Sequence, residues 1–147
     1  MTRRSGKVSS WLLPIAIICL LAGLIVMRSR PAPMPEYFDK TLTLTSAKAK
    51  SAESGKPIVA LATADWCPPC KSLKRNALVD PRVSAFMKDK VVPVYLDATS
   101  SMPSDAEYLN VYSIPTMIVI KDGTEIARFS GDQSADMVLA FLEQNAR

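Results

Sequence analysis

The chain has 147 residues, of which 48% are hydrophobic and 22% charged, so one globular domain of ordinary size is expected. Its formal charge of +4 would suit a nucleic-acid-binding protein, but the excess lies in one segment. Of the 18 basic residues, five lie within residues 1–30, which hold no acid; 13 basic and 14 acidic residues therefore remain in 31–147. This nearly neutral remainder has no basic stripe, which excludes a nucleic-acid partner.

The N-terminal region divides into a short basic segment, residues 1–10, and an apolar run, residues 11–27. The run has 17 residues without a charge, or about 25 Å as a helix. Adding Val8 to Ser10 lengthens it to 20 residues, close to what a hydrocarbon core of about 30 Å requires. We predict that residues 11–27 form a transmembrane signal anchor.

A cleaved signal peptide and a lipoprotein signal are the two alternatives for this run. No Ala-x-Ala pattern follows it, and Cys19 lies inside the run instead of ending it, so we favour the uncleaved anchor. Three basic residues precede the run and two follow it. This bias predicts a single-pass protein of the inner (cytoplasmic) membrane whose C-terminal domain faces the periplasm or another extracytoplasmic space.

Residues 28–40 contain prolines at 31, 33 and 35. Alternating prolines favour an extended, semi-rigid chain. We interpret this segment as a Pro-rich linker that holds a domain of residues 41–147 clear of the membrane.

The first half of that domain predicts alternating strands and helices. In order, we expect a short strand at 41–44, a helix at 46–54, a buried strand at 57–63, a helix from Cys67 to about Ala77, and a further helix from Asp80. Gly55-Lys56-Pro57 is a helix stop, and Asp80-Pro81 is a cap followed by a first-turn proline. Val83, Phe86 and Met87 give this last helix an apolar face.

The second half predicts a strand at 91–96, a short helix at 101–109, two strands at 117–120 and 125–129, and a helix at 134–145. Asp122-Gly123 is a hairpin signal between the two strands. The final helix presents an apolar face of Met137, Val138, Phe141 and Leu142. This order predicts an α/β fold with a central mixed sheet flanked by helices on both faces.

The motif Trp66-Cys67-Pro68-Pro69-Cys70-Lys71 stands at the junction of the buried strand and the following helix. The first turn of a helix has unpaired N–H groups, and these favour a thiolate on Cys67. Cys70 follows one turn later, close enough to form a disulfide. The pair is therefore a candidate two-electron switch.

The cysteine pair could instead be part of a zinc site or form a purely structural disulfide. A zinc site needs two more ligands, yet the chain has no histidine, and its one remaining cysteine is Cys19 in the apolar run. A purely structural disulfide across so short a ring constrains the unfolded chain little. We therefore favour redox activity and expect neither a metal nor a cofactor.

Together with Ile114-Pro115-Thr116 before the strand at 117–120, this motif resembles thioredoxin over roughly residues 42–146. The resemblance implies a thioredoxin-like fold in which Pro115 is cis and contacts Cys67 and Cys70. It also implies that a substrate polypeptide pairs beside Pro115, in contact with Ile114 and Thr116.

A closer similarity is to the periplasmic C-terminal domain of the thiol-disulfide interchange protein DsbD. It rests on Ala64-Asp65-Trp66-Cys67, on Asp80-Pro81-x-Val83, and on Leu109-Asn110-Val111 before the Ile-Pro-Thr. The two prolines between the cysteines instead resemble those of tryparedoxins and nucleoredoxin. These relatives are mostly disulfide reductases.

The chain departs from these relatives in the charges around the cysteines. The buried aspartate of thioredoxins corresponds to Leu61, the glutamate of the DsbD domain to Lys74, and the lysine of the following strand to Pro93. Asp65 is the nearest acid left in the sequence. Losing acids and adding Lys71 or Lys74 should lower the pKa of Cys67.

We expect Cys67 to attack a substrate disulfide and Cys70 to resolve the mixed disulfide. Trp66 should pack beside the pair and shield it. At the same time we interpret it as a core aromatic residue. Pro68 and Pro69 should fix the backbone between the sulfurs. Because prolines add neither charge nor a hydrogen-bond donor there, we favour a disulfide reductase.

The expected partners are protein substrates with disulfides and an electron donor, either a membrane carrier or a thioredoxin-type protein. We expect a monomer, since no segment is dedicated to dimerisation. Two alternative functions remain, a disulfide oxidase or isomerase on the same fold and a non-catalytic thioredoxin-like binding adaptor.

Overall fold

The structure is a computed structural model that describes residues 11–147, so the basic segment 1–10 lies outside the described residues. The chain divides into two compact units, residues 1–30 and residues 31–147, which are considered separately. In the first unit, helix α1 (Leu12–Ser29) exposes its apolar side chains along its length, from Leu13 (68% exposed) to Ile25 (67%). None of the helices within residues 11–147 combines the length and apolar character that crossing a bilayer demands.

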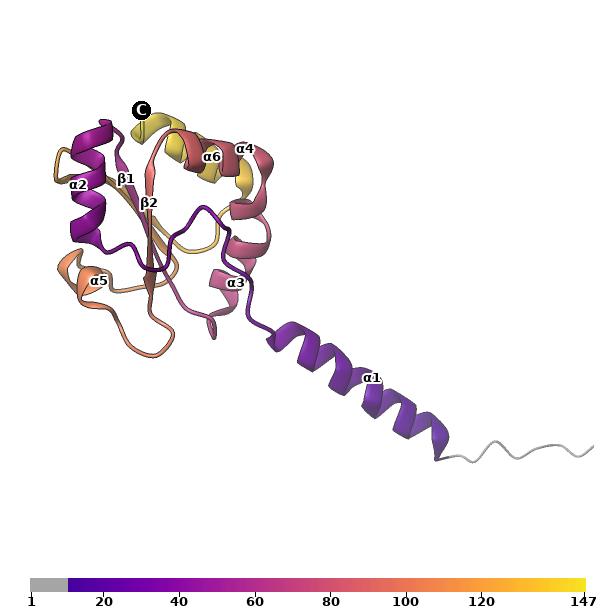
Figure 1. Cartoon of the computed structure of the whole chain (residues 1–147). Helices are drawn as coiled ribbons and strands as arrows, with labels where there is room; N and C mark the ends of the chain where they lie inside the picture. The colour runs from indigo at the N-terminus through magenta and orange to yellow at the C-terminus, as the bar shows by residue number, and fades with distance from the viewer. Residues whose placement is uncertain (1–10) are drawn as a thin grey trace, which may run out of the picture. The chain divides into compact units, whose positions relative to one another are not determined.

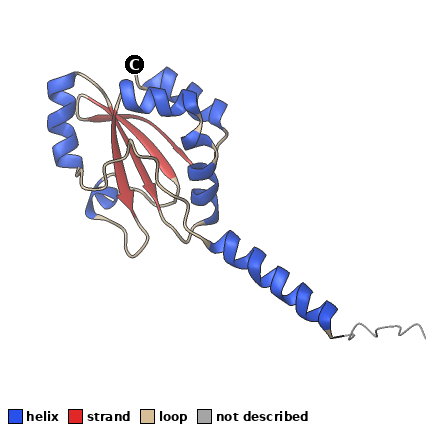
Figure 2. Ribbon diagram, turned by 45° about the vertical axis from the view of Figure 1, so that its right-hand side comes forward, coloured by secondary structure: helices blue, strands red, loops and turns tan. Residues whose placement is uncertain are grey.

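The second unit is built on a four-stranded mixed sheet (Figure 2). Its strands are β1 (Ile58–Thr63), β2 (Val92–Asp97), β3 (Thr116–Lys121) and β4 (Thr124–Ser130), in the order β2-β1-β3-β4. β1 pairs with β2 in parallel and with β3 in antiparallel, and β3 and β4 form an antiparallel hairpin. The mixed sheet is thus confirmed.

Helices cover both faces of this sheet, as predicted (Figure 1). Helices α2 (Leu44–Ser54) and α5 (Ser104–Tyr108) cover one face. The other face carries α3 (Pro68–Arg75), the short 3-10 helix η1 (Ala77–Val79), α4 (Pro81–Asp89) and α6 (Ala135–Asn145). Because β1 lies between two other strands and two helical layers, all six of its residues are buried.

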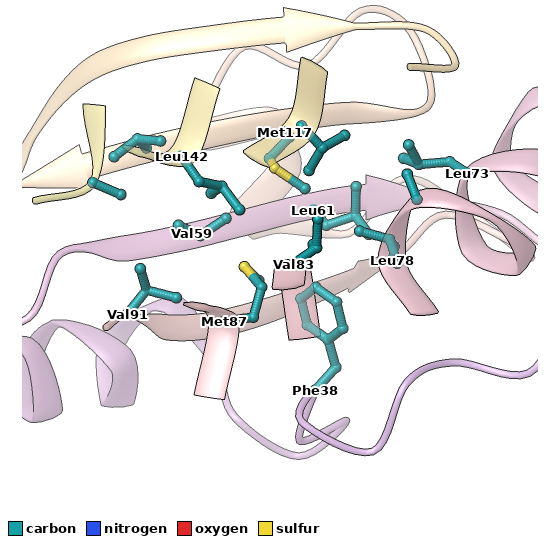
Figure 3. Packing of buried hydrophobic residues seen from close by; sticks show 14 of the residues in the cluster. Phe38, Val59, Leu61, Leu73, Leu78, Val83, Met87, Val91, Met117 and Leu142 are labelled. Carbon is teal, nitrogen blue, oxygen red and sulfur yellow. The ribbon is translucent and has the colours of Figure 1, made fainter. Parts of the chain in front are cut away.

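The larger core lies between the sheet and the second group of helices (Figure 3). Val59 and Leu61 point from β1 toward Leu73 of α3, Met87 of α4 and Leu142 of α6. All five side chains are completely buried. α3, which begins at the cysteine motif, is therefore anchored to the centre of the sheet by its own apolar face.

The short strand expected at 41–44 is wrong, because residues near it cap a helix instead. Thr43 Oγ1 accepts a hydrogen bond from the Ser46 amide (3.2 Å), and the Asp105 carboxylate accepts one from the Leu44 amide (2.9 Å). These bonds satisfy amide groups of the first turn, so α2 begins at Leu44. It ends at Gly55 in the left-handed conformation (φ 68°), as the predicted stop requires.

Residues 31–40, which were predicted to be part of a semi-rigid linker, pack against the domain. Ala32 and Phe38 are buried, and the Tyr37 hydroxyl donates a hydrogen bond to the Leu78 carbonyl (2.8 Å). Asp39 also forms an isolated parallel bridge with Val94 on the outer edge of β2. The segment packs because its aromatic side chains find apolar partners, and the compact unit begins at Pro31 instead of residue 41.

Most other predicted elements are confirmed with small shifts at their ends. The helix from the cysteine motif ends at Arg75, two residues early, and Asp80 caps the next helix with Pro81 in its first turn. The prediction of a core position for Met137 is wrong, since this side chain is 60% exposed. Val138 and Leu142, one helical turn apart, define the buried side of α6 and leave Met137 turned outward.

Candidate active site

Cys67 and Cys70 form a disulfide at the N-terminus of α3, with their Cα atoms 5.2 Å apart. Cys67 is the N-cap residue, and its sulfur accepts a hydrogen bond from the Cys70 amide at 3.3 Å. Pro68 and Pro69 occupy the first two helical positions, where the N–H groups they lack would have no partner in the helix. Both cysteines are buried, but Cys67 retains 3% exposure and Cys70 none, so Cys67 is the more accessible of the two.

The loop before β3 lies against Cys67. The Ile114–Pro115 peptide bond is cis, as the resemblance implies, and the Cys67 sulfur lies 3.8 Å from the Ile114 carbonyl oxygen. The Thr116 hydroxyl donates to the Ser113 carbonyl (2.7 Å), and the Gly131 amide donates to the Pro115 carbonyl (2.8 Å). These bonds fix the loop on the β3–β4 hairpin and present the Ile114 backbone to the disulfide.

Trp66 is 62% exposed, which corrects its interpretation as a core aromatic residue. Its indole N–H donates to the Thr99 carbonyl (3.0 Å), and the Asp65 amide donates to the Thr99 hydroxyl (3.0 Å). Asp97 in turn accepts a hydrogen bond from the Thr99 amide (2.9 Å). Sequence reasoning missed Thr99, although Asp-x-Thr directly after a strand is a recognisable turn signal.

A groove of about 390 Å³ opens beside the disulfide. It is lined by Trp66, by residues 98–102 and by residues 112–114. Tyr112 at its rim is 89% exposed. Exposed aromatic side chains are enriched where proteins bind one another.

The three charged residues predicted near the cysteine pair, Asp65, Lys71 and Lys74, differ in their burial. Lys74 is 1% exposed, and its ammonium lies 2.8 Å from the Asp65 carboxylate, which is 39% exposed. Lys71 is half-buried on the same helix. The Lys74 ammonium also lies 5.8 Å from the ring centre of Tyr95. Burial, and then the charges of Asp97 and Asp65, raise the pKa of Tyr95, so its ring stays neutral.

A family model described as a thioredoxin-like domain matches residues 44–146. The chain belongs to this family. The matched residues include the Cys67–Cys70 disulfide, the Ile114–Pro115 loop and the residues that line the neighbouring groove. Its family and its Cys-x-x-Cys disulfide make the chain a thioredoxin-like thiol-disulfide oxidoreductase.

Individual relatives agree with this assignment. Thioredoxin Y1 of Arabidopsis thaliana chloroplasts is 31% identical over 108 residues, which are 74% of this chain and 60% of that protein. The thiol:disulfide interchange protein DsbD of Salmonella typhi is 28% identical over 123 residues, 74% of this chain but only 22% of DsbD. The reduced C-terminal domain of Neisseria meningitidis DsbD superposes with a TM-score of 0.59 at 27% identity, over 74% of this chain and 98% of that one.

Proposed function

We propose that the chain is a membrane-anchored protein-disulfide reductase that acts outside the cytoplasm. The observation that carries the proposal is the Cys67–Cys70 disulfide at the N-terminus of α3, beside the Ile114–Pro115 loop. This function is also supported by the slight exposure of Cys67, the full burial of Cys70 and the neighbouring groove lined by Trp66 and Tyr112.

The proposed reaction begins with both cysteines reduced. The Cys67 thiolate attacks a sulfur of the substrate disulfide, that bond breaks, and the departing substrate thiolate takes a proton from water. Cys70 then loses its proton and attacks the Cys67 sulfur. The mixed disulfide breaks, the second substrate thiolate leaves, and Cys67–Cys70 becomes a disulfide. Two electrons thus pass from the chain to the substrate.

A second dithiol must then return two electrons to Cys67–Cys70. Any such donor forms its own disulfide in the exchange, so atoms and electrons balance without a cofactor. We propose a membrane carrier or a thioredoxin-type protein as this donor, and a monomeric chain as its acceptor.

The residues between the sulfurs favour one direction of electron flow. Pro68 and Pro69 supply neither charge nor an N–H group to the thiolate. A less stabilised thiolate keeps the dithiol strongly reducing, whereas strong oxidants stabilise their reduced form. This favours a reductase over an oxidase or isomerase on the same fold.

Trapping a substrate tests this function. A Cys70→Ser variant cannot resolve the mixed disulfide, so substrates should stay bound to Cys67 and separate only on reduction. Cys67→Ser is the matched control and should capture none. Capture by neither variant, with both folded, would favour the binding adaptor.

The proposed anchor is supported by the apolar surface of α1. A helix that is apolar all round is normally covered by protein or lipid, and 18 residues give about 27 Å, a few ångströms short of a bilayer core. We expect the full chain to stay with membranes after alkaline carbonate extraction and residues 31–147 to be released. Release of both would contradict the anchor.

A further inference from the structure

We propose that the buried ammonium of Lys74, held in place by Asp65, stabilises the thiolate of the reduced cysteine pair and thereby sets the redox equilibrium. The inference rests on the proposed function, because it gives Lys74 a role in thiol–disulfide exchange. Lys74 touches no substrate, so it is a positioning charge and not a catalytic residue.

Lys74 is almost completely buried. Among the side chains that the structure describes, it is the only charged one that is buried. Removing an ammonium from water costs free energy unless a partner compensates for it. The Asp65 carboxylate at 2.8 Å is that partner, and the face of Tyr95 adds a second favourable contact. The ammonium therefore has a fixed position inside the domain.

Lys74 lies on the same face of α3 as the inner cysteine, Cys70. The buried face of α3 consists of Cys70, Leu73 and Lys74. Residues four apart on a helix have Cβ atoms about 5–6 Å from each other, so Lys74 follows directly behind the inner sulfur. Asp65 precedes the outer sulfur by two residues. The ion pair therefore joins the residue two before Cys67 to the residue one helical turn after Cys70.

The contribution of this ion pair to stability does not account for its presence. A buried ion pair is often no more stabilising than apolar side chains of similar volume. Leu73 and Leu78 of the same segment are completely buried, so apolar side chains at both positions of the pair would also suit this part of the domain. The charge of Lys74 therefore calls for an explanation besides stability.

The sign of the effect follows from the charges facing the pair. In the oxidised state both sulfurs are neutral, whereas reduction can place a negative charge on Cys67. Lys74 and the half-buried Lys71 favour that charge, while Asp65 and Asp97 oppose it, and Tyr95 stays neutral. Asp65 and Asp97 reach solvent, which screens them, so the fully buried Lys74 should dominate.

Three variants of the full chain test the proposal. Lys74→Met removes the charge, Lys74→Arg keeps it, and the double variant Asp65→Asn/Lys74→Met removes both charges. For each, the thiolate of Cys67 is titrated by its ultraviolet absorbance, and the Cys67–Cys70 disulfide is equilibrated with glutathione. Circular dichroism establishes that each variant is folded.

We expect Lys74→Met to raise the pKa of Cys67 and to shift the glutathione equilibrium toward the protein disulfide by about tenfold, which corresponds to about 30 mV. Lys74→Arg should remain close to the wild type. The double variant should fall between the wild type and Lys74→Met, because it also removes the opposing charge of Asp65. Equal values for Lys74→Met and the wild type, or equal changes in Lys74→Met and Lys74→Arg, would overturn the proposal.

A measurement on the wild-type chain tests the proposal even where a variant does not fold. The carbon and nitrogen resonances of the Lys74 side chain should change on reduction and then follow the titration of Cys67. Identical Lys74 resonances in the oxidised and reduced chain would overturn the inference. If instead the wild-type pair does not exchange with glutathione at all, the proposed function itself fails.

Discussion

Two buried threonine hydroxyls near the active site have opposite environments. Thr116 Oγ1 donates to the Ser113 carbonyl and shares a 2.7 Å hydrogen bond with Ser130 Oγ. Thr63 Oγ1, at the end of β1, has no hydrogen-bond partner in the part of the chain that the structure describes. An unpaired buried hydroxyl destabilises a fold, whereas a paired one contributes to it.

Valine has the shape of threonine without the hydroxyl, so it isolates this difference. Thr63→Val should increase the free energy of unfolding by about 1 kcal/mol, because it removes an unpaired polar atom. Thr116→Val should decrease it by about 1 to 3 kcal/mol, because it leaves the partners of the hydroxyl unsatisfied. Urea unfolding of both variants measures this, and a loss of stability in Thr63→Val would show that its hydroxyl has a partner.

At the scale of single elements, helix α4 depends on Asp80. Its carboxylate accepts hydrogen bonds from the Arg82 amide (2.9 Å) and the Arg82 guanidinium. The side-chain bond from Arg82, followed by the amide bond, lowers the pKa of Asp80. In the unfolded chain this carboxyl has a pKa of about 3.9. The folded state therefore releases the Asp80 proton more readily than the unfolded state does.

This difference gives a pH dependence of known sign. The stabilisation from Asp80 is fully present above its unfolded pKa and is lost as the pH falls through its lower folded pKa. Asp80→Asn can still cap the helix but cannot titrate, so its stability should fall less steeply on acidification. Arg82→Met removes the main cause of the lowered pKa, so it should lose less stability than the wild type over the same acid range. Parallel acid curves for the wild type and Asp80→Asn would refute this.

The elements that were predicted well are those with local signals. Gly55, Asp80-Pro81 and Asp122-Gly123 each determine a turn or helix end through their own backbone preferences, and all three lie where expected. Cys67 and Cys70 were predicted for the same reason, since their spacing and the preceding strand are local features. The roles proposed for Ile114, Pro115 and Thr116 in substrate binding stay predictions.

The features that were missed depend on contacts between distant segments. The periodicity of α3 does not reveal that Lys74 is buried. The burial of Lys74 depends on contacts outside the helix, with Asp65 and with Tyr95 of β2. Phe38 was assigned to a spacer because of the prolines around it. Its burial depends on Tyr95, whose ring centre lies 6.3 Å from its own. Such contacts cannot be predicted from the composition of the segment alone.

At the scale of the whole molecule, residues 31–40 complete the thioredoxin-like domain. Phe38 belongs to the main core, together with Val59, Leu61 and Met87 (Figure 3). A domain trimmed to residue 44, where the family match begins, would leave this part of the core open. The shortest stable fragment should therefore begin near Pro31.

Phe38→Ala tests this assignment. It should lower the free energy of unfolding by about 3–5 kcal/mol, the usual cost of deleting a buried phenylalanine. Glu36→Ala is the matched control, since Glu36 is exposed in the same segment and its replacement should change stability by less than about 0.5 kcal/mol. Urea unfolding of residues 31–147 compares them, and equal stabilities would mean that the segment is only a linker.

The reduction potential of the Cys67–Cys70 pair tests the central claim most directly. Residues 31–147 form a compact unit with their own core, so this fragment can be equilibrated with glutathione or dithiothreitol. A reductase requires a potential close to the roughly −270 mV of thioredoxin, and this is the value that we predict. A potential close to the roughly −120 mV of a strong oxidant would contradict the account and make the chain a catalyst of disulfide formation.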